Sequence, residues 1–211
     1  MGGVTVPKNA YHHGDLRNAL VLTAARLIED DGLGEFSLRA AAREVGVSAN
    51  AAYRHFSDKS DLLTAVAAHG FERLARRMRR SMNATRTGKT PAEVAVNRVK
   101  ATGRAYVQFA LAHPELFGVM FGRSCAITLA PGDPAEDEAS TYALLGSALD
   151  DLVSSGVLGV ARRPGAELKV WVTVHGFARL CLDGAVKLPP GSTRAAALED
   201  LLDFAVAGIC G

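Results

Sequence analysis

Apolar side chains recur along this chain with the period of an α-helix. In residues 16–28 they stand at intervals of three and four residues, a spacing that places them on one face of a helix. The stripe comprises Leu16, Ala19, Leu20, Thr23, Ala24, Leu27 and Ile28. Strict alternation of apolar and polar residues, which would indicate a half-buried strand, is rare. The sequence therefore predicts an all-α fold.

One segment resembles a strand in its composition. Residues 168–174 (LKVWVTV) alternate and are rich in β-branched side chains. No second segment of similar quality exists to pair with it, and residues 176–182 continue with helical spacing. We therefore predict a helix that is apolar nearly all round and buried on two sides.

Capping residues divide the chain into about nine helices. Ser37, Ser48 and Ser57 are expected to cap the second, third and fourth helices, and Gly46 suits the left-handed end of the second. Thr90-Pro91-Ala92-Glu93 has the pattern of a capping box, and the helix that it opens should stop before His113-Pro114. The first predicted helix begins near residue 16 and is ended by Gly32 or Gly34. The others are approximately 38–45, 49–56, 58–82, 91–112, 116–121, 139–155, 166–182 and 193–209.

Residues 37–56 have the pattern of a helix-turn-helix, in which the second helix enters the major groove of DNA. Two short helices meet at Gly46-Val47-Ser48, and small side chains at Ala41, Ala42 and Ala51 would allow them to cross closely. The outer face must stay thin or polar to approach base edges. Residues expected to project toward bases are Ala49, Asn50 and Tyr53, with Arg54, His55 and Lys59 near phosphates.

A series of short motifs surrounds this pattern. Gly46-Val47-Ser48 is followed by Tyr53-Arg54-His55-Phe56, then by Asp58-Lys59 and Leu62-Leu63. With the opening Tyr11-His12-His13-Gly14-Asp15-Leu16-Arg17, residues 11–67 resemble the DNA-binding region of TetR-type transcriptional regulators. The opening motif, residues 113–117 (HPELF), and Trp171, His175 and Gly176 are similar to a subgroup with a Trp-His-Gly signature in its C-terminal domain. This second resemblance spans residues 100–185.

The resemblance implies roles for individual residues. It places Ser48, Ala49, Asn50 and Ala51 at positions that contact bases or the DNA backbone, and Tyr53, His55 and Lys59 at phosphates. Contacts from the preceding helix would come from Ser37 and Arg39. Ala52 departs from the family pattern, which often has a larger apolar residue there. Other interpretations remain open, since Tyr53 and Phe56 could be core aromatics and His55 an incidental surface residue. Asn50 is suited to reading adenine.

The fourth helix carries a second basic run, Arg73, Arg76, Arg77, Arg79 and Arg80. Such a stripe can mark a nucleic-acid contact. However, Arg77 is 18 residues beyond Lys59, which is roughly 27 Å along a helix axis. We therefore favour a solvated face, or pairing with acids such as Glu136–Glu138.

Residues 100–211 contain no catalytic constellation, so an enzyme is not expected. Large apolar residues there are either core or the lining of a small-molecule site; they are Tyr106, Phe109, Phe117, Met120, Phe121, Trp171 and His175. The resemblance favours the site, because the family's C-terminal domain typically binds an effector. It also implies a homodimer through the last two helices. The apolar residues expected at this interface are Val170, Val174, Phe177, Cys181, Leu198, Leu201, Leu202, Ala205 and Ile209.

Charge and cysteine content argue against a membrane protein, a secreted protein and a disulfide-bonded or metal-binding protein. No window of about 18 residues lacks a charge and Met1–Gly14 has no hydrophobic signal core, so we expect a cytoplasmic protein without a membrane contact. Cys125, Cys181 and Cys210 lie far apart, which predicts idle thiols rather than a disulfide or metal site, with a redox-sensing cysteine as the alternative. The net charge of +2 conceals a balance of +7 in residues 1–104 and −5 in residues 105–211.

The hypothesis is therefore a homodimeric transcriptional regulator, a repressor without cofactor or metal. Residues 1–60 would read a palindromic operator in double-stranded DNA, and the fourth helix (about 58–82) would link them to an effector-binding and dimerisation domain at 83–211, beyond the polar stretch 81–89. An unknown small-molecule effector would shift the spacing of the two DNA-binding domains of the dimer. The alternatives are a DNA-binding dimer without a ligand pocket, and an all-α small-molecule-binding protein or enzyme.

Overall fold

The computed structural model describes residues 13–86, 88–122 and 140–211 of the 211-residue chain. Within these ranges it contains nine α-helices, one 3₁₀ turn and no strand, so the predicted all-α fold is confirmed. The elements are α1 (His13–Asp31), α2 (Leu38–Val45), α3 (Ala49–Tyr53), α4 (Lys59–Ala84), α5 (Pro91–Ala112), α6 (Pro114–Met120), α7 (Thr141–Ser154), η1 (Val160–Arg162), α8 (Ala166–Leu182) and α9 (Arg194–Cys210).

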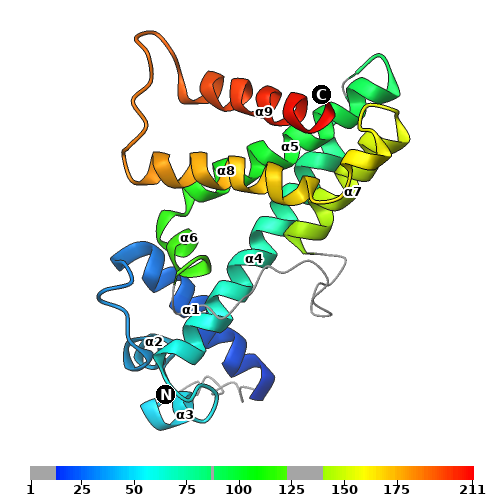
Figure 1. The fold of residues 1–211 in the computed structure, drawn as a ribbon. Helices are drawn as coiled ribbons and strands as arrows, with labels where there is room; N and C mark the ends of the chain where they lie inside the picture. The colour runs from blue at the N-terminus through cyan, green and yellow to red at the C-terminus, as the bar shows by residue number, and fades with distance from the viewer. Residues whose placement is uncertain (1–12, 87, 123–139) are drawn as a thin grey trace, which may run out of the picture.

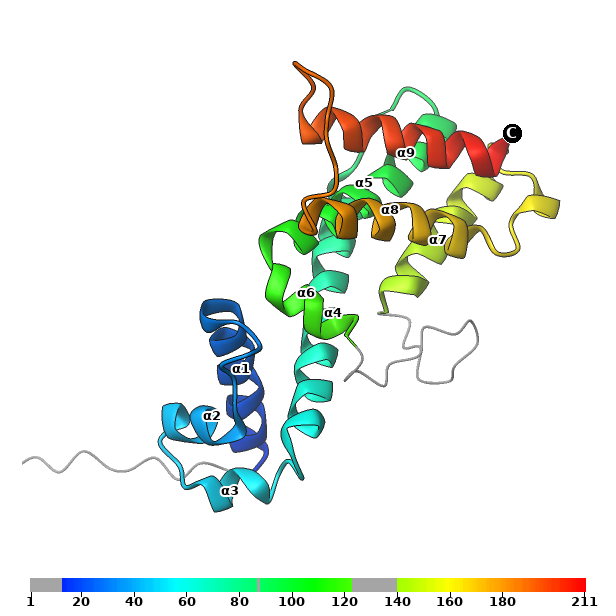
Figure 2. The ribbon, with the colours of Figure 1, turned by 60° about the vertical axis from the view of Figure 1, so that its left-hand side comes forward.

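The helices form two groups that α4 connects. Helices α1, α2 and α3 lie beside the first half of α4, with α1 in contact with it (Figure 1). Helices α5 and α7 pack on the rest of α4, and α8 and α9 pack on α5 and on each other. Helix α6 lies between the groups and contacts both α1 and α4. Figure 2 shows α8 and α9 running side by side at the end of the molecule farthest from α3. One long helix therefore links the two ends of the molecule.

Several predicted boundaries need correction. Asp58, not Ser57, caps α4, because the Asp58 carboxylate accepts a 2.8 Å hydrogen bond from the Asp61 N–H, while Ser57 donates its own N–H to the Asp61 side chain. Helix α4 continues to Ala84, into the polar stretch predicted as a boundary, and α3 ends at Tyr53 rather than near Phe56. Cys125, the predicted loop at 131–138 and Glu136–Glu138 lie outside the described residues.

Segment 168–174 is helical, as predicted, but it is not buried on two sides. Val170 and Val174 are buried, whereas Leu168 and Val172 are 53% and 51% exposed. The four valine and leucine side chains therefore divide α8 into an inner and an outer face. Its strand-like composition reflects apolar residues on both faces of one helix.

Close packing fixes α5 against the last two helices. Gly103 of α5 is buried, and a methyl group added there would overlap Leu202 Cδ2 of α9 and approach Val174 Cγ1 of α8 to 3.3 Å. The absence of a side chain at Gly103 therefore lets three helices meet.

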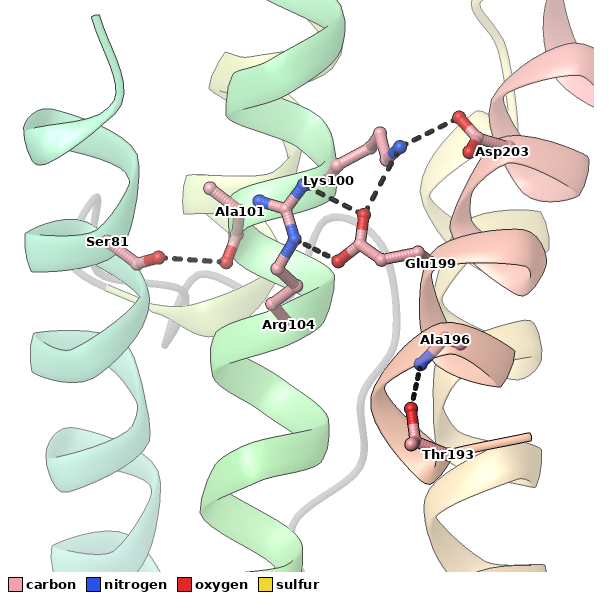
Figure 3. Close-up of polar contacts among 8 residues, drawn as sticks. All are labelled: Ser81, Lys100, Ala101, Arg104, Thr193, Ala196, Glu199 and Asp203. Atoms are coloured by element: carbon pink, nitrogen blue, oxygen red, sulfur yellow. Dashed lines mark hydrogen bonds and ion pairs between the residues drawn. The ribbon is translucent and has the colours of Figure 1, made fainter. Parts of the chain in front are cut away.

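An ion-pair network reinforces the contact between α5 and α9 (Figure 3). Lys100 Nζ lies 2.8 Å from Asp203 Oδ1 and 3.3 Å from Glu199 Oε2, and Arg104 donates to Glu199. Burial alone would lower the pKa of Lys100, but the hydrogen bonds to Asp203 and Glu199 raise it. The hydrogen bond from Arg104 lowers the pKa of Glu199. The network therefore stays charged near neutral pH and ties α9 to α5.

Candidate functional site

Side-chain and backbone caps define the turn between α2 and α3. Ser37 Oγ accepts from the Ala40 N–H at 3.1 Å, and Ser48 Oγ accepts from the Ala51 N–H at 3.2 Å. Between them Gly46 has φ 83°, a left-handed conformation that favours glycine. The Val47 N–H donates to Ala42 O at 2.9 Å and closes the end of α2. Helix α2 therefore starts and ends where the sequence predicts, and α3 starts at its predicted cap, Ser48, although it ends at Tyr53.

The two faces of this unit differ in chemistry. Ala41, Ala42, Ala52 and Phe56 are at most 1% exposed. Ala51, which we expected on the inner face, is only half-buried, and Ala52 takes the inner position instead. A residue as small as alanine at position 52 lets α3 lie close to the core. Phe56 is therefore a core residue.

The outer face of α3 is open to solvent. Asn50 and Arg54 are exposed, and Tyr53 is 45% exposed, which is unusual for a large aromatic side chain without a partner surface. Ser37, Arg39 and Ser48 are also exposed, whereas Ala49 and His55 are half-buried. The structure thus gathers the polar candidates for DNA contact around one short helix.

Two cations near this surface have defined partners. Lys59 Nζ donates to Leu33 O at 3.3 Å and lies 5.6 Å from the centre of the Phe36 ring, so it points toward the loop before α2. Arg17 of α1, which we did not predict as a site residue, lies 4.9 Å from the centre of the Phe56 ring. Arg17 stands in the opening motif, but nothing in the sequence shows that it reaches the end of α3.

A polar cluster joins α1 to the second group of helices. Arg73 of α4 forms a 3.2 Å ion pair with Glu29 of α1, and His113 Nδ1 lies 2.6 Å from the same carboxylate. His113 follows α5 and precedes α6. Glu29 therefore connects the helix that supports α2 and α3 with the start of α6.

Five of the seven predicted effector-site residues form an aromatic cluster. They are Tyr106, Phe117, Phe121, Trp171 and His175. Their ring centres lie 4.7–6.4 Å apart, with the shortest separation between Phe121 and His175. Phe109 instead packs on His113 at 4.9 Å, and Met120 packs near Gly70 of α4. The cluster thus joins α5, α6 and α8.

A hydrogen-bonded chain runs through the cluster. The Trp171 Nε1–H donates to the Tyr106 hydroxyl at 3.2 Å. The Tyr106 hydroxyl also forms a hydrogen bond with His175 Nδ1, 2.8 Å away, and the tautomer of the His175 ring sets which of the two donates. Burial lowers the pKa of His175, and the charge of Arg179 acts in the same direction. Burial also raises the pKa of Tyr106. Both side chains are therefore neutral at neutral pH.

The described residues leave little empty space beside this chain. A cavity of about 20 Å³ lies against Tyr106 and Trp171, with a wall that also includes residues we did not predict. These are Met78, Thr102, Gly103, Thr141, Tyr142 and Leu145. Such a volume holds about one water molecule. Within residues 13–86, 88–122 and 140–211, no histidine, cysteine or carboxylate cluster is arranged to hold a metal ion.

Comparison with known families agrees with this geometry. Residues 20–66 match the family of bacterial regulatory proteins called tetR, and residues 99–205 match the tetracyclin repressor-like C-terminal domain. The second match alone covers half of the chain. The chain belongs to the TetR family. It is a helix-turn-helix DNA-binding transcription regulator, and members of this family are not enzymes.

Solved structures extend the similarity over the whole TetR chain. A protein of unknown function from Rhodococcus sp. RHA1 is 32% identical, with a TM-score of 0.74 over 97% of this chain and 100% of that one. A TetR from Acinetobacter baumannii AYE is 20% identical, with a TM-score of 0.62 over 97% and 96%. A TetR family regulator from Marinobacter aquaeolei VT8 is 20% identical, with a TM-score of 0.60 over 90% and 93%. No curated protein sequence matches the chain.

TetR family regulators bind DNA as dimers, so the placement of the predicted interface residues is informative. Val170, Val174, Leu198, Leu202, Ala205 and Ile209 are at most 7% exposed within this single chain. They pack inside the protomer, while Phe177, Cys181 and Leu201 are half-buried. The outer faces of α8 and α9 instead expose Leu168, Val172, Leu180 and Phe204.

The part of the TetR chain that the structure describes contains no helix long and apolar enough to cross a membrane.

Proposed function

We propose that this TetR-family regulator is a repressor that binds a palindromic operator as a homodimer and leaves it when a small-molecule effector binds. The exposed outer face of α3, with Asn50 beside Tyr53 and Arg54, carries this proposal. Residues 1–60 would form the reading head, α4 the link, and residues 83–211 the effector and dimer domain. A DNA-bound regulator would act in the cytoplasm.

DNA specificity rests on few side chains in this proposal. Asn50 is the one side chain of α3 that can form a paired hydrogen bond with adenine. Arg39 and Arg54 would hold phosphates, which positions the helix but carries no sequence information. A single head contacts few bases, so a two-fold dimer on a palindrome supplies the remaining specificity.

The dimer would use the outer faces of α8 and α9. Four of the seven large apolar residues that are exposed among the described residues lie on these two helices. Phe204 is 71% exposed, which leaves most of an aromatic ring in water unless a partner covers it. Phe177, Cys181 and Leu201 would lie at the edge of this interface.

The effector would bind at the aromatic cluster. The chain Trp171–Tyr106–His175 offers polar tips among aromatic rings, which is the composition of many small-molecule sites. The same arrangement supports membership of the subgroup with the Trp-His-Gly signature, since Trp171 and His175 meet one turn apart on α8. Phe121 is half-buried and meets His175 edge to face, so its movement would open space for a ligand.

A specific observation favours a second candidate, a DNA-binding dimer that takes no effector at this cluster. The adjoining cavity is about 20 Å³, whereas ligand sites commonly measure roughly 300–1,000 Å³. Trp171 is the only tryptophan of the chain and lies in the cluster, so its fluorescence distinguishes the two candidates. Compounds that release DNA and change Trp171 fluorescence support the first candidate. Release without such a change places the effector elsewhere.

Footprinting of the promoter beside the gene, followed by binding titrations, tests the DNA function. We expect a protected palindrome. Asn50→Ala should weaken binding to this site by about 1–3 kcal/mol and leave random DNA unaffected, whereas Arg54→Ala should weaken both. Equal losses for Asn50→Ala on both DNAs would exclude direct base reading, and the absence of any protected palindrome would refute the regulator model.

A further inference from the structure

A large open groove lies between α4 and α5, outside the reading head and the aromatic cluster. Its volume is about 650 Å³, and four arginines line it together with residues of α5 and the residue that follows α5. We call this feature the arginine groove; it is defined by Arg73, Arg76, Arg77, Arg80, Gln108 and His113. Its volume lies within the range of small-molecule sites.

Helical spacing explains why the arginines converge. Residues 73, 76, 77 and 80 follow one another at intervals that place them on one face of α4. Opposite them α5 presents Ala105, whose small side chain leaves room, and the groove ends at Phe109, which is only 2% exposed, and at the half-buried His113. The groove therefore has a cationic wall and little exposed aromatic surface.

The charges of the groove are only partly neutralised. Arg73 pairs with Glu29 and Arg76 pairs with Glu72. Arg77 instead donates to the neutral amide of Gln108 at 3.0 Å, and Arg80 donates to the Arg76 carbonyl. Among the described residues neither has an acidic partner. Guanidinium groups remain charged at any ordinary pH. The groove is therefore lined by the positive charges of Arg77 and Arg80, which have no acidic partner among the described residues, and by those of Arg73 and Arg76, which are paired with glutamates.

We propose that the arginine groove binds a small molecule that carries phosphate or carboxylate groups. Arg77 and Arg80 would form paired hydrogen bonds with the anionic group, since the planar guanidinium fits two oxygens of a phosphate or carboxylate. Gln108 is already within reach of Arg77 and would orient it.

The distance to the reading head argues against DNA as the occupant. Arg77 is 18 residues from the start of α4, where Lys59 lies close to α3. The rise of an α-helix separates the two by roughly 27 Å along the axis. Figure 2 shows the second half of α4 leading away from α3 toward α8 and α9. A duplex on α3 is therefore too far from the groove.

Calorimetric titration with sodium pyrophosphate and with citrate at constant ionic strength tests the proposal. Wild-type protein should bind at least one of these probes. The double variant Arg77→Gln/Arg80→Gln should lose at least about tenfold in affinity because the paired hydrogen bonds are gone. The matched control Arg79→Gln/Arg86→Gln removes two charges, one near the C-terminal end of α4 and one just beyond it, outside the groove, and should change affinity less than about twofold.

Three further measurements make the result decisive. Thermal unfolding without the probe shows whether the double variant folds, and Arg77→Lys/Arg80→Lys, which keeps both charges, should give an intermediate loss. Asn50→Ala should bind the probes as wild type does, so the outcome does not depend on the proposed operator function. No binding by the wild type, or equal losses in the groove and control variants, would overturn the proposal. Loss of random-duplex affinity in the groove variant without probe binding would also overturn it.

Discussion

The Tyr106 hydroxyl lies 2.8 Å from His175 Nδ1, and this hydrogen bond joins α5 to α8 inside the aromatic cluster. Tyr106 is 3% exposed, and the same hydroxyl also accepts from Trp171. One oxygen atom therefore serves two neighbouring polar groups in an apolar region. We therefore expect this atom to contribute to the stability of the second helical group.

Replacement of Tyr106 by Phe tests this dependence. The Trp171 N–H and the His175 ring would each lose a partner, and we expect the free energy of unfolding to fall by about 1–2 kcal/mol. Urea unfolding followed by Trp171 fluorescence measures the change. Tyr53→Phe makes the same chemical change on the exposed outer face of α3, and its effect should stay within about 0.5 kcal/mol. Equal effects of the two variants would contradict the role of the hydroxyl.

Stability should also depend on pH through His175 and His69. Burial lowers the pKa of both rings below the ordinary value of 6.5, with Arg179 and Arg73 acting in the same direction. The unfolded chain therefore takes up protons first as the pH falls. The stability that comes from keeping these two rings neutral is fully present above pH 6.5. It is lost as the pH falls through this value toward the lowered pKa values of the folded state.

Urea unfolding at several pH values between about 5.5 and 7.5, where histidines titrate, measures this loss. Wild-type protein should become less stable toward the acidic end. His175→Gln and His69→Gln should each reduce the slope of unfolding free energy against pH, and the double variant should reduce it further. A slope that is unchanged in His175→Gln would show that His175 does not titrate as its burial implies.

The proposed dimer predicts a strong effect at Phe204. Phe204→Asp would place a charge in the middle of an apolar interface, and we expect the dimer to weaken by at least about tenfold. Sedimentation measures the association, and circular dichroism measures folding. Val160→Asp is the matched control, since Val160 is 77% exposed in η1 and Phe204 is 71% exposed. Unchanged association of Phe204→Asp would place the interface elsewhere.

The contact at Gly103 predicts a loss of stability. In Gly103→Ala the new methyl group would overlap Leu202, which is 1% exposed and has little freedom to move. We expect a cost of about 1–3 kcal/mol, with part of it recovered by Leu202→Val in the same chain. Gly118 of α6 has nothing near its missing methyl group, so Gly118→Ala should be neutral or slightly stabilising. A stable Gly103→Ala variant would mean that α9 can shift away from α5.

Local signals in the sequence were sufficient for most of the helices. Thr90, Ser37 and Ser48 cap α5, α2 and α3 as predicted, because each accepts a hydrogen bond from an N–H three residues further along the chain. The cap of α4 was predicted one residue early, since Ser57 and Asp58 are both good capping residues and only the fold shows that Asp58 accepts the hydrogen bond from the Asp61 N–H.

Contacts between distant parts of the chain could not be predicted in the same way. The spacing of apolar residues in α8 and α9 identifies two faces but does not say which one meets α5 and which remains outside. We therefore assigned Val170 and Leu202 to a dimer interface, whereas the structure buries both within one protomer. The link from Glu29 to Arg73 and His113 depends on the positions of three helices, which no local pattern encodes.

The division of α8 and α9 into two faces also affects which protomers can associate with each other. Val174 and Leu202 hold each protomer together from within, so the outer residues such as Leu168 and Phe204 can change without disturbing the folded core. In the proposed dimer, folded protomers would therefore separate and exchange partners without unfolding. After a gene duplication, changes at a few outer residues alone would let the two copies prefer their own kind as dimer partner. The copies would then stop forming mixed dimers before their DNA targets differ.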